Sequence, residues 1–189
     1  LGEAEREHGA LFQYRSIETD VLGFLLERAT ATALADLISE HLWQPMGAAE
    51  DAYITVDDGG AALADGGLCA TLRDYGRFAQ LLVDGGRRGD RQIVPAGWIE
   101  ETRNGDGALY QGIYRTVLPD GAYHNKFWIE DTKRRAMWAR GIYGQSIYID
   151  PEAAFAVVKL STWPETSSPE RSIEALAAFN AIRRALTSD

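Results

Sequence analysis

Residues 12–23, with the sequence FQYRSIETDVLG, place a tyrosine immediately before an amphipathic segment. Apolar residues recur in and just after this segment at helical spacing: Ile17, Val21, Phe24 and Leu25. They predict a helix that buries one apolar face. Tyr14 would then lie just before the N-terminus of an anchored helix, where positive partial charge favours a phenolate. The alternative is a half-buried tyrosine whose hydroxyl donates to a backbone carbonyl, and the residues alone leave both interpretations open.

Composition and charge exclude several classes of function. The 189 residues suffice for one compact domain with a core. A net charge of −9 argues against a nucleic-acid partner and against an anionic membrane surface. No run approaches the roughly 18 apolar residues of a membrane span. The single cysteine, Cys69, excludes an internal disulfide framework and leaves the compartment undetermined.

Metal and cofactor chemistry find no support in the sequence. The three histidines are dispersed and show none of the paired spacing of a zinc site: His8, His41 and His124. The paired aspartates within residues 48–67 lack the alternating ligands and closing glutamate of a calcium loop. We therefore expect no metal and no cofactor.

Periodicity divides the chain into two parts of one structural domain. Residues 1–109 are predicted to be mainly helical, with a capping box at residues 71–74 that begins one helix. Residues 110–189 are predicted to form an antiparallel sheet and a C-terminal helix packed on it. The expected strands are 110–118, 122–129, 135–141, 146–150 and 154–161, the last a central strand covered on both faces. Helices, then hairpins, then a helix indicate an α+β fold.

Tyr14-Arg15-Ser16, followed by residues 19–23, resembles the Tyr-x-Asn segment of the serine β-lactamase-like superfamily. The sequence of this segment is most similar to the branch of 6-aminohexanoate-dimer (nylon-oligomer) hydrolases and family VIII esterases. The resemblance implies a β-lactamase/transpeptidase-like fold in which Tyr14 is the proton shuttle beside a nucleophilic serine. Ser16 stands where the superfamily usually has the asparagine that holds a lactam side chain, which disfavours β-lactamase activity.

A second phrase, residues 139–145 (ARGIYGQ), resembles the superfamily's third motif, Lys-Thr-Gly in β-lactamases. We expect this phrase at a sheet edge, where unpaired N–H groups are available; a simple β-bulge is the alternative. Under the resemblance, the backbone N–H of Ile142 belongs to the oxyanion hole, and Gly141 lets substrate approach closely. Tyr143 and Trp138 would line the acyl pocket. The lysine is absent, since Ala139 takes its place.

The superfamily's first motif, Ser-x-x-Lys, is absent from the sequence. The lysines are Lys126, Lys133 and Lys159, and the residues three before them are Tyr123, Glu130 and Ala156. No Gly-x-Ser-x-Gly elbow replaces the motif. We therefore expect this chain to be the C-terminal portion of a longer protein. The N-terminal strands and the nucleophile helix would lie in a preceding segment, without which the chain would be inactive and unstable.

The resemblance implies a serine hydrolase that cleaves a small amide or ester through an acyl-enzyme. Its partners would be that small-molecule substrate and the missing N-terminal segment. Two alternatives remain. One is a β-lactamase or D-amino-acid peptidase of the same superfamily, and the other is a non-catalytic scaffold or fragment that lacks the nucleophile.

Overall fold

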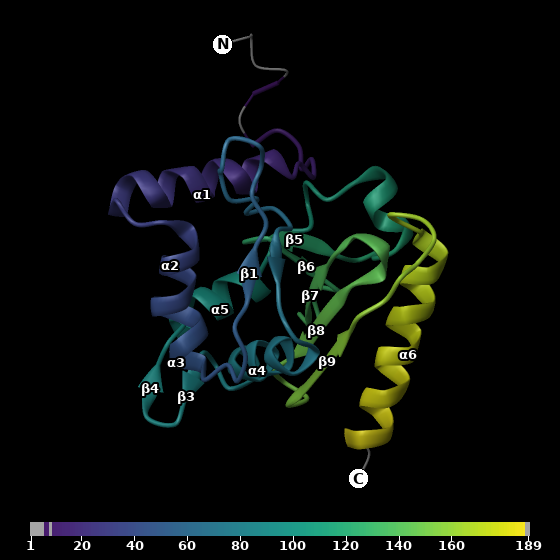
Figure 1. Cartoon of the computed structure of the whole chain (residues 1–189). Coiled ribbons are helices and arrows are strands. Elements are labelled where there is room, and N and C mark those ends of the chain that lie inside the picture. Colours follow the sequence, from purple (N-terminus) through teal and green to yellow (C-terminus); the bar gives the residue numbers. More distant parts are fainter. Residues whose placement is uncertain (1–5, 8, 188–189) are drawn as a thin grey trace.

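The computed structural model describes residues 6–7 and 9–187 as helices that surround one antiparallel sheet (Figure 1). The helices are α1 (Ile17–Thr30), α2 (Leu34–Ile38), α3 (Gln44–Met46), α4 (Leu72–Val83), α5 (Ala96–Arg103) and α6 (Pro169–Thr187). A π-helical turn (Ser39–Trp43) joins α2 to α3, and 3₁₀ turns occupy Gly112–Thr116 and Ile142–Gly144. None of the described helices is both long and apolar enough to span a membrane.

The main sheet has five strands in sequence order, each antiparallel to its neighbour: β5 (Ala122–His124), β6 (Phe127–Ile129), β7 (Met137–Arg140), β8 (Ser146–Asp150) and β9 (Phe155–Lys159). Two short hairpins lie apart from it: β1 (Tyr53–Ile54) with β2 (Leu68–Cys69), and β3 (Arg87–Arg88) with β4 (Arg91–Gln92). Short turns join successive strands, so the sheet is a meander. The expected α+β arrangement of helices, antiparallel sheet and C-terminal helix is confirmed.

One face of the sheet is built from large aromatic side chains. The register pairs Trp128 with Trp138 and Trp138 with Tyr148, so these three residues stand in a row across β6, β7 and β8. They are buried beneath α6, which contributes Ala175 and Phe179. Phe179 meets the Trp138 ring edge-on at 6.1 Å. This aromatic layer fixes the C-terminal helix on the sheet.

The opposite face is aliphatic and is covered by α4 and α5. Because side chains alternate along a strand, Met137 and Ile149 lie directly behind the aromatic row, and their register pairs them. They pack with Leu82 of α4 and Ile99 of α5. As the capping box predicted, α4 begins where the Thr71 side chain accepts the N–H of Asp74. The elements on the two faces of the sheet thus form three layers: α6, then the sheet, then α4 with α5.

Three sequence predictions are wrong. Residues 110–118 are not a strand, because that segment contains the 3₁₀ turn Gly112–Thr116. Residues 122–129 form two strands rather than one, since Asn125 and Lys126 adopt positive φ and reverse the chain. The strand expected at the centre of the sheet, β9, lies at its edge among the described strands, although α4 packs against it.

The predicted helix α1 forms, but its apolar face is not buried in the described chain. Its only buried residue is Gly23, where an added Cβ would lie 3.0 Å from the Ala64 Cβ. The four residues expected to face the core are between 46% and 59% exposed: Ile17, Val21, Phe24 and Leu25. Only the small residue Gly23 is buried against its surroundings, so the large side chains of the helix stay about half exposed.

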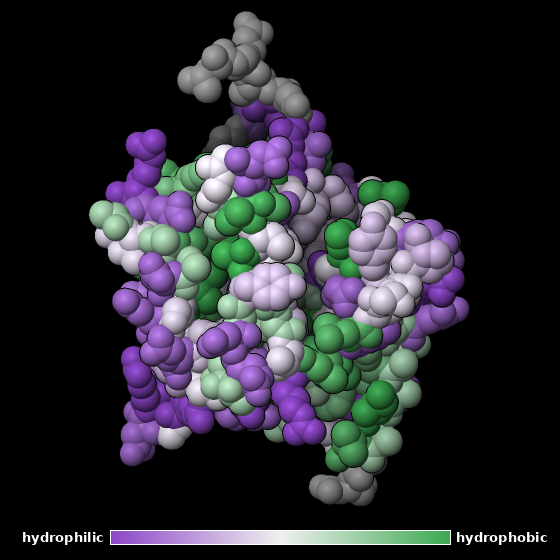
Figure 2. Space-filling view, viewed as in Figure 1, coloured by the Kyte–Doolittle hydropathy of each residue, from purple (hydrophilic) through white to green (hydrophobic). Residues whose placement is uncertain are grey.

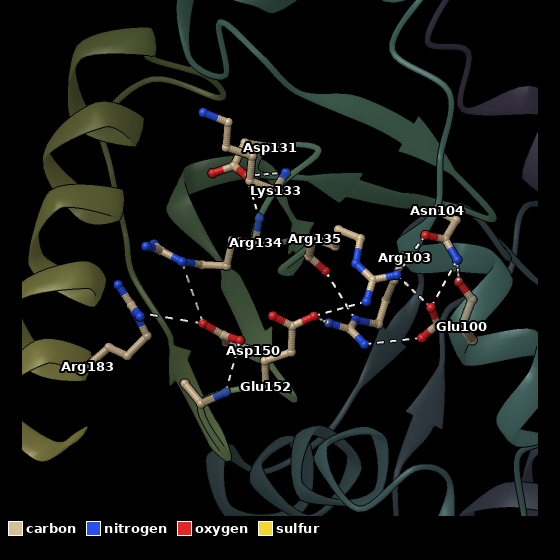
Figure 3. A network of polar contacts seen from close by, with 11 residues as sticks. Glu100, Arg103, Asn104, Asp131, Lys133, Arg134, Arg135, Asp150, Glu152 and Arg183 are labelled. Carbon is tan, nitrogen blue, oxygen red and sulfur yellow. Dashed lines mark hydrogen bonds and ion pairs between the residues drawn. The ribbon is translucent and has the colours of Figure 1, made fainter.

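A network of charges locks α5 and α6 to the far end of the sheet (Figure 3). Arg103 of α5 donates to Glu152 in the β8–β9 turn at 2.7 Å. On the other side, the buried carboxylate of Asp150 lies 3.8 Å from Arg183 Nε of α6 and 3.9 Å from Arg134 Nε. The network lies at the opposite end of β7 and β8 from Arg140 and Ser146, so its role is structural.

We expect Asp150→Ala to lower the free energy of unfolding by roughly 3 kcal/mol, because Arg183 would lose its carboxylate while remaining largely buried. Urea unfolding measures this. Glu165→Ala is the matched control, since Glu165 and Arg171 form an ion pair in which both side chains are about half exposed; it should cost less than about 1 kcal/mol. Equal effects of the two substitutions would contradict the structural role of Asp150.

Candidate active site

The site forms where β7 extends beyond its neighbour β6. On the β8 side, pairing continues to Arg140, opposite Ser146. On the β6 side, the paired residues of β7 are Met137 and Trp138. The motif was expected at a sheet edge, but β7 is the middle strand. The open edge is therefore local to residues 139–141, where the chain offers backbone groups without a neighbouring strand.

Two cavities meet at this end of β7. The smaller, which we call the aromatic cavity, has a volume of about 380 Å³ and includes Trp128, Trp138 and Trp163 in its walls. The larger cavity, of about 770 Å³, lies between the glycine-rich segment 63–70 and the ends of β7 to β9. The residues common to both cavities are Tyr14, Arg140, Gly141, Ile142, Gln145 and Ser146. A ligand at the junction of the two cavities would contact this shared group.

Tyr14 is placed by aromatic contacts and a backbone hydrogen bond. Its ring stacks on Trp128 at 5.3 Å with an interplanar angle of 25°, and Tyr123 meets it edge-on at 5.7 Å. Its N–H donates to the hydroxyl of Tyr114 at 3.0 Å. Within the described residues the Tyr14 hydroxyl makes no hydrogen bond. The proposed bond to a backbone carbonyl is thus absent there, and the hydroxyl is available to a ligand.

The electrostatic surroundings of Tyr14 favour its protonated form. Burial, followed by the negative charge of Asp65, raises the pKa of Tyr14, whereas the Arg140 cation lowers it. The helix α1 begins three residues later, at Ile17. A phenolate at neutral pH would need a further cation.

Arg140 extends from β7 between two indole rings. Its Cζ lies 5.1 Å from the centre of the Trp128 ring and 4.9 Å from that of Trp138. Its Nη2 donates to Ser172 Oγ of α6 at 2.9 Å. Burial lowers the pKa of this guanidinium, opposed by the hydroxyl groups of Tyr110 and Tyr14. Arginine remains charged in such a position, so the site holds a permanent cation.

The loop after β7 is held tightly, and it leaves one N–H unused. Gly141 N–H donates to Gln145 O at 2.9 Å, and Tyr143 N–H donates to Thr166 O at 3.1 Å. The N–H between them, that of Ile142, has no hydrogen-bond partner within the described chain. Gly144, at φ +85°, fits only without a side chain, because a Cβ would lie 2.4 Å from the Trp163 ring.

Of the other predicted site residues, two line a cavity and one lines neither cavity. Ser16 lines the larger cavity, and its hydroxyl does not cap α1. Trp138 lines the aromatic cavity but is 1% exposed, so it forms part of the core as well as the wall. Tyr143, at φ +56°, lines neither cavity; its carbonyl accepts the N–H of Trp163.

Sequence reasoning missed three residues that the structure brings to the site. Trp128 and Trp163 are separated from Tyr14 by more than 100 residues, and only the strand register and the loop before α6 bring them together. Asp65 lies within residues 48–67, for which the sequence indicated no role at a site, yet its charge acts on Tyr14. The sequence carried no signal for these three residues. Arg140, by contrast, lies within the quoted motif at residues 139–145.

The comparisons with known proteins agree with this geometry. Helices around an antiparallel sheet of five strands, with a C-terminal helix packed on it, define a β-lactamase/transpeptidase-like fold. The β-lactamase family matches the chain over residues 3–181. The chain therefore belongs to the β-lactamase family, and its homologues are hydrolases.

Individual relatives lie in the branch that the resemblance indicated. A 6-aminohexanoate-dimer hydrolase of Paenarthrobacter ureafaciens is 35% identical over 156 residues, which are 82% of this chain. A structure from Bacillus anthracis, provisionally assigned as a 6-aminohexanoate-dimer hydrolase, is 30% identical over 97% of this chain with a TM-score of 0.86. The chain spans only 40% and 46% of these two proteins. A family VIII carboxylesterase, 16% identical, shares the fold with a TM-score of 0.57 over 84% of this chain and 55% of its own.

We expect Asp65→Asn to lower the pKa of Tyr14, because it removes the charge that disfavours the phenolate, and Arg140→Met to raise it. Absorbance at 295 nm during a pH titration reports this, with the Tyr14→Phe curve subtracted. The subtraction matters because burial also raises the pKa of Tyr110, to about 12. Asp57→Asn, a change in the surface loop, should leave the titration unaltered. A Tyr14 pKa that ignores Asp65→Asn would contradict this electrostatic account.

Proposed function

We propose that this chain is the C-terminal part of a serine hydrolase that cleaves a small amide or ester through an acyl-enzyme. One observation carries the proposal: the Tyr14 hydroxyl and the Ile142 N–H both lie at the open end of β7, and neither has a partner within the described residues. A free proton donor beside a free backbone N–H suits acyl transfer. The names of the relatives support a substrate with an amide or ester bond.

In the proposed mechanism the nucleophile comes from a preceding Ser-x-x-Lys segment. The serine oxygen attacks the acyl carbon, its proton passes to the lysine, and the Ile142 N–H stabilises the oxyanion. Tyr14 then relays a proton to the leaving amine or alcohol, and later takes one from the attacking water. Once it has accepted the serine proton, the lysine is the cation that Tyr14 needs in order to ionise near neutral pH.

The larger cavity and the exposed face of α1 are where we place the preceding segment. The cavity is lined chiefly by apolar and small residues, including Leu68, Ala70, Val158 and Leu160. In Figure 2, apolar side chains are exposed near the centre of the view and toward its lower right, where β9 and α6 lie in Figure 1. A segment bound in the larger cavity and over α1 would reach Tyr14, which lines that cavity. It would also cover apolar groups that the described residues leave in solvent.

The remaining predicted residues have supporting roles in the proposal. Gly141 has no room for a side chain, since a Cβ there would lie 2.9 Å from the Gln145 Cβ. In the proposal its bare backbone also lets the substrate approach. Ser16 contacts substrate from the larger cavity, and Trp138 forms the floor of the aromatic cavity. Tyr143, which lines neither cavity, contributes only by shaping the loop that presents Ile142.

In the full-length protein we expect Tyr14→Phe to reduce kcat for a 4-nitroanilide or 4-nitrophenyl ester by about 100-fold or more, the usual contribution of a general acid–base. The unfolding midpoint should change little, because the hydroxyl has no partner to lose within the described chain. Tyr53→Phe is the control, since Tyr53 is 67% exposed and lines neither cavity. Full activity of the Tyr14→Phe protein would refute the role of Tyr14.

A serine-directed fluorophosphonate should label the full-length protein at the serine of a preceding Ser-x-x-Lys segment, as located by peptide mass spectrometry. Labelling elsewhere, or none, would favour a non-catalytic scaffold. Turnover of a chromogenic cephalosporin at a rate comparable with ester hydrolysis would instead support the β-lactamase alternative. Ser16 and the missing motif lysine speak against that outcome.

Residues 1–189 expressed alone should self-associate and bind a hydrophobic dye, because α1 exposes six large apolar side chains that need a cover. Adding the preceding segment should yield a protein that unfolds cooperatively and protects Phe24 and Leu25 from hydroxyl-radical footprinting. A monomeric and cooperatively folded 189-residue chain would contradict this expectation.

A further inference from the structure

The turn that carries the unused Ile142 N–H has an unfavourable backbone conformation. Tyr143, the next residue, has φ +56° and ψ +21°, which is a left-handed conformation that residues with a side chain rarely adopt. Gly144 follows with a φ of +85°. Residues in such conformations persist only where the surrounding structure holds them. The turn at residues 141–145 therefore needs support from outside itself.

The support comes from the β9–α6 segment, residues 159–166, which begins at the last residue of β9 and runs toward α6. Both backbone groups of Tyr143 pair with this segment. The Tyr143 N–H donates to Thr166 O, and the Tyr143 carbonyl accepts the N–H of Trp163, each at 3.1 Å. The strained residue is thus fixed at both of its polar backbone groups.

Gly144 is held by the same segment. Lys159 Nζ donates to Gly144 O at 2.9 Å. The same Nζ lies 4.7 Å from the centre of the Trp163 ring. That ring lies so close to Gly144 that any side chain there would collide with it. A cation and an indole of the β9–α6 segment therefore enclose Gly144 from two directions.

Gln145 contacts the segment through its side chain. Its amide donates to Ser161 O at 2.6 Å and accepts the N–H of Ser161 at 2.9 Å. The backbone pairs of β8 with β9 begin only at the next residue, Ser146, which is opposite Lys159. An amide side chain offers both a donor and an acceptor, as a peptide unit does. The Gln145 side chain therefore continues the pairing at the point where the backbone ladder stops.

The backbone of Gln145 connects this support to the Ile142 N–H. The Gln145 carbonyl accepts the N–H of Gly141 at 2.9 Å, and the Gln145 N–H donates to Ile142 O at 3.4 Å. A displacement of Gln145 would therefore move the residues on which the direction of the Ile142 N–H depends. Direction matters because an oxyanion donor works only within about 2.7–3.1 Å of the place where the charge develops.

We propose that Gln145 is a positioning residue whose side-chain amide holds the turn at residues 141–145 so that the Ile142 N–H points at the developing oxyanion. The inference rests on the proposed hydrolase function. It adds that the donor is set in place by a contact with Ser161, 16 residues further along the chain, and not by the turn alone. Because Ser161 occupies the amide, Gln145 acts on the reaction through Ile142.

The test compares Gln145→Met with the wild type in the full-length protein, since methionine keeps the length of the side chain and removes its hydrogen bonds. With 4-nitrophenyl butanoate we expect kcat to fall about 10- to 100-fold, somewhat less than for the loss of an oxyanion donor, and KM to change less than about threefold. The Ki of butylboronic acid should rise by a factor similar to the fall in kcat, because a serine-bound boronate places an oxygen where the oxyanion forms.

The boronate separates positioning from mere stability. A Ki does not depend on the amount of folded enzyme, so a variant that only folded less well would lose rate at an unchanged Ki. Direct contact of Gln145 with the substrate would instead raise KM. Either of these results would overturn the proposal, as would a wild-type protein that hydrolyses the ester and is not inhibited by butylboronic acid.

Two further variants define the effect. Gln80→Met is the matched control, because the Gln80 amide is exposed on α4 and donates to Asp84; its kcat and Ki should be those of the wild type. Lys159→Met removes the single hydrogen bond to Gly144 O and should show the signature of Gln145→Met with a smaller loss.

Hydrogen exchange measured by mass spectrometry provides a readout that needs no turnover. Gln145→Met should speed amide exchange in peptides that cover residues 141–145 and 159–166 by about 10-fold, and should leave β5 and β6 unchanged. Faster exchange in a protein that hydrolyses no ester would uphold the support of the turn and refute the hydrolase. Ester hydrolysis with unchanged kcat and Ki in Gln145→Met would refute the positioning role alone.

Discussion

The row of Trp128, Trp138 and Tyr148 across three strands is the contact on which the site depends. Strand register puts these rings side by side, and α6 covers them through Phe179. The same row then supplies a surface for groups outside the sheet. Tyr14 stacks on Trp128, and Arg140 lies between the two indoles. A shift of register by one residue would turn these rings to the other face and remove the supports of both groups.

The two faces of the sheet have different roles. The aliphatic face, against α4 and α5, is closed and contributes to stability. The aromatic face is closed beneath α6 but opens where β7 runs past β6. Large rigid rings leave gaps that flexible side chains would fill, and here the gap is the aromatic cavity. The half-buried cation of Arg140 lies in its wall, so the opening is not merely apolar.

Two errors in the sequence analysis, the burial of α1 and the position of β9 in the sheet, share one cause. The pattern within a segment does not reveal which segments lie beside it. The apolar spacing of residues 17–25 correctly predicted α1, yet burial needs a second surface, and within the described chain Gly23 is the only residue of α1 that is buried. The apolar run of β9 was expected in the sheet centre, but strand order places it at the edge. Both exposed surfaces match the proposal that further chain covers them.

The sequence by itself determined the α+β class, a mainly helical first part followed by an antiparallel sheet and a C-terminal helix, the start of α4 at its capping box and the two motifs around Tyr14 and Ile142. These features follow from local chemistry, namely periodicity, capping side chains and turn residues, or from motif resemblance. Only the tertiary structure decided that Tyr14 rests on Trp128, that Arg140 lacks a carboxylate partner among the described residues, and that Tyr143 lies outside both cavities. Those facts depend on which strands pair, in which register, and on how the loop before α6 folds back. Such long-range contacts are set by the packing of the whole chain and leave no local signal.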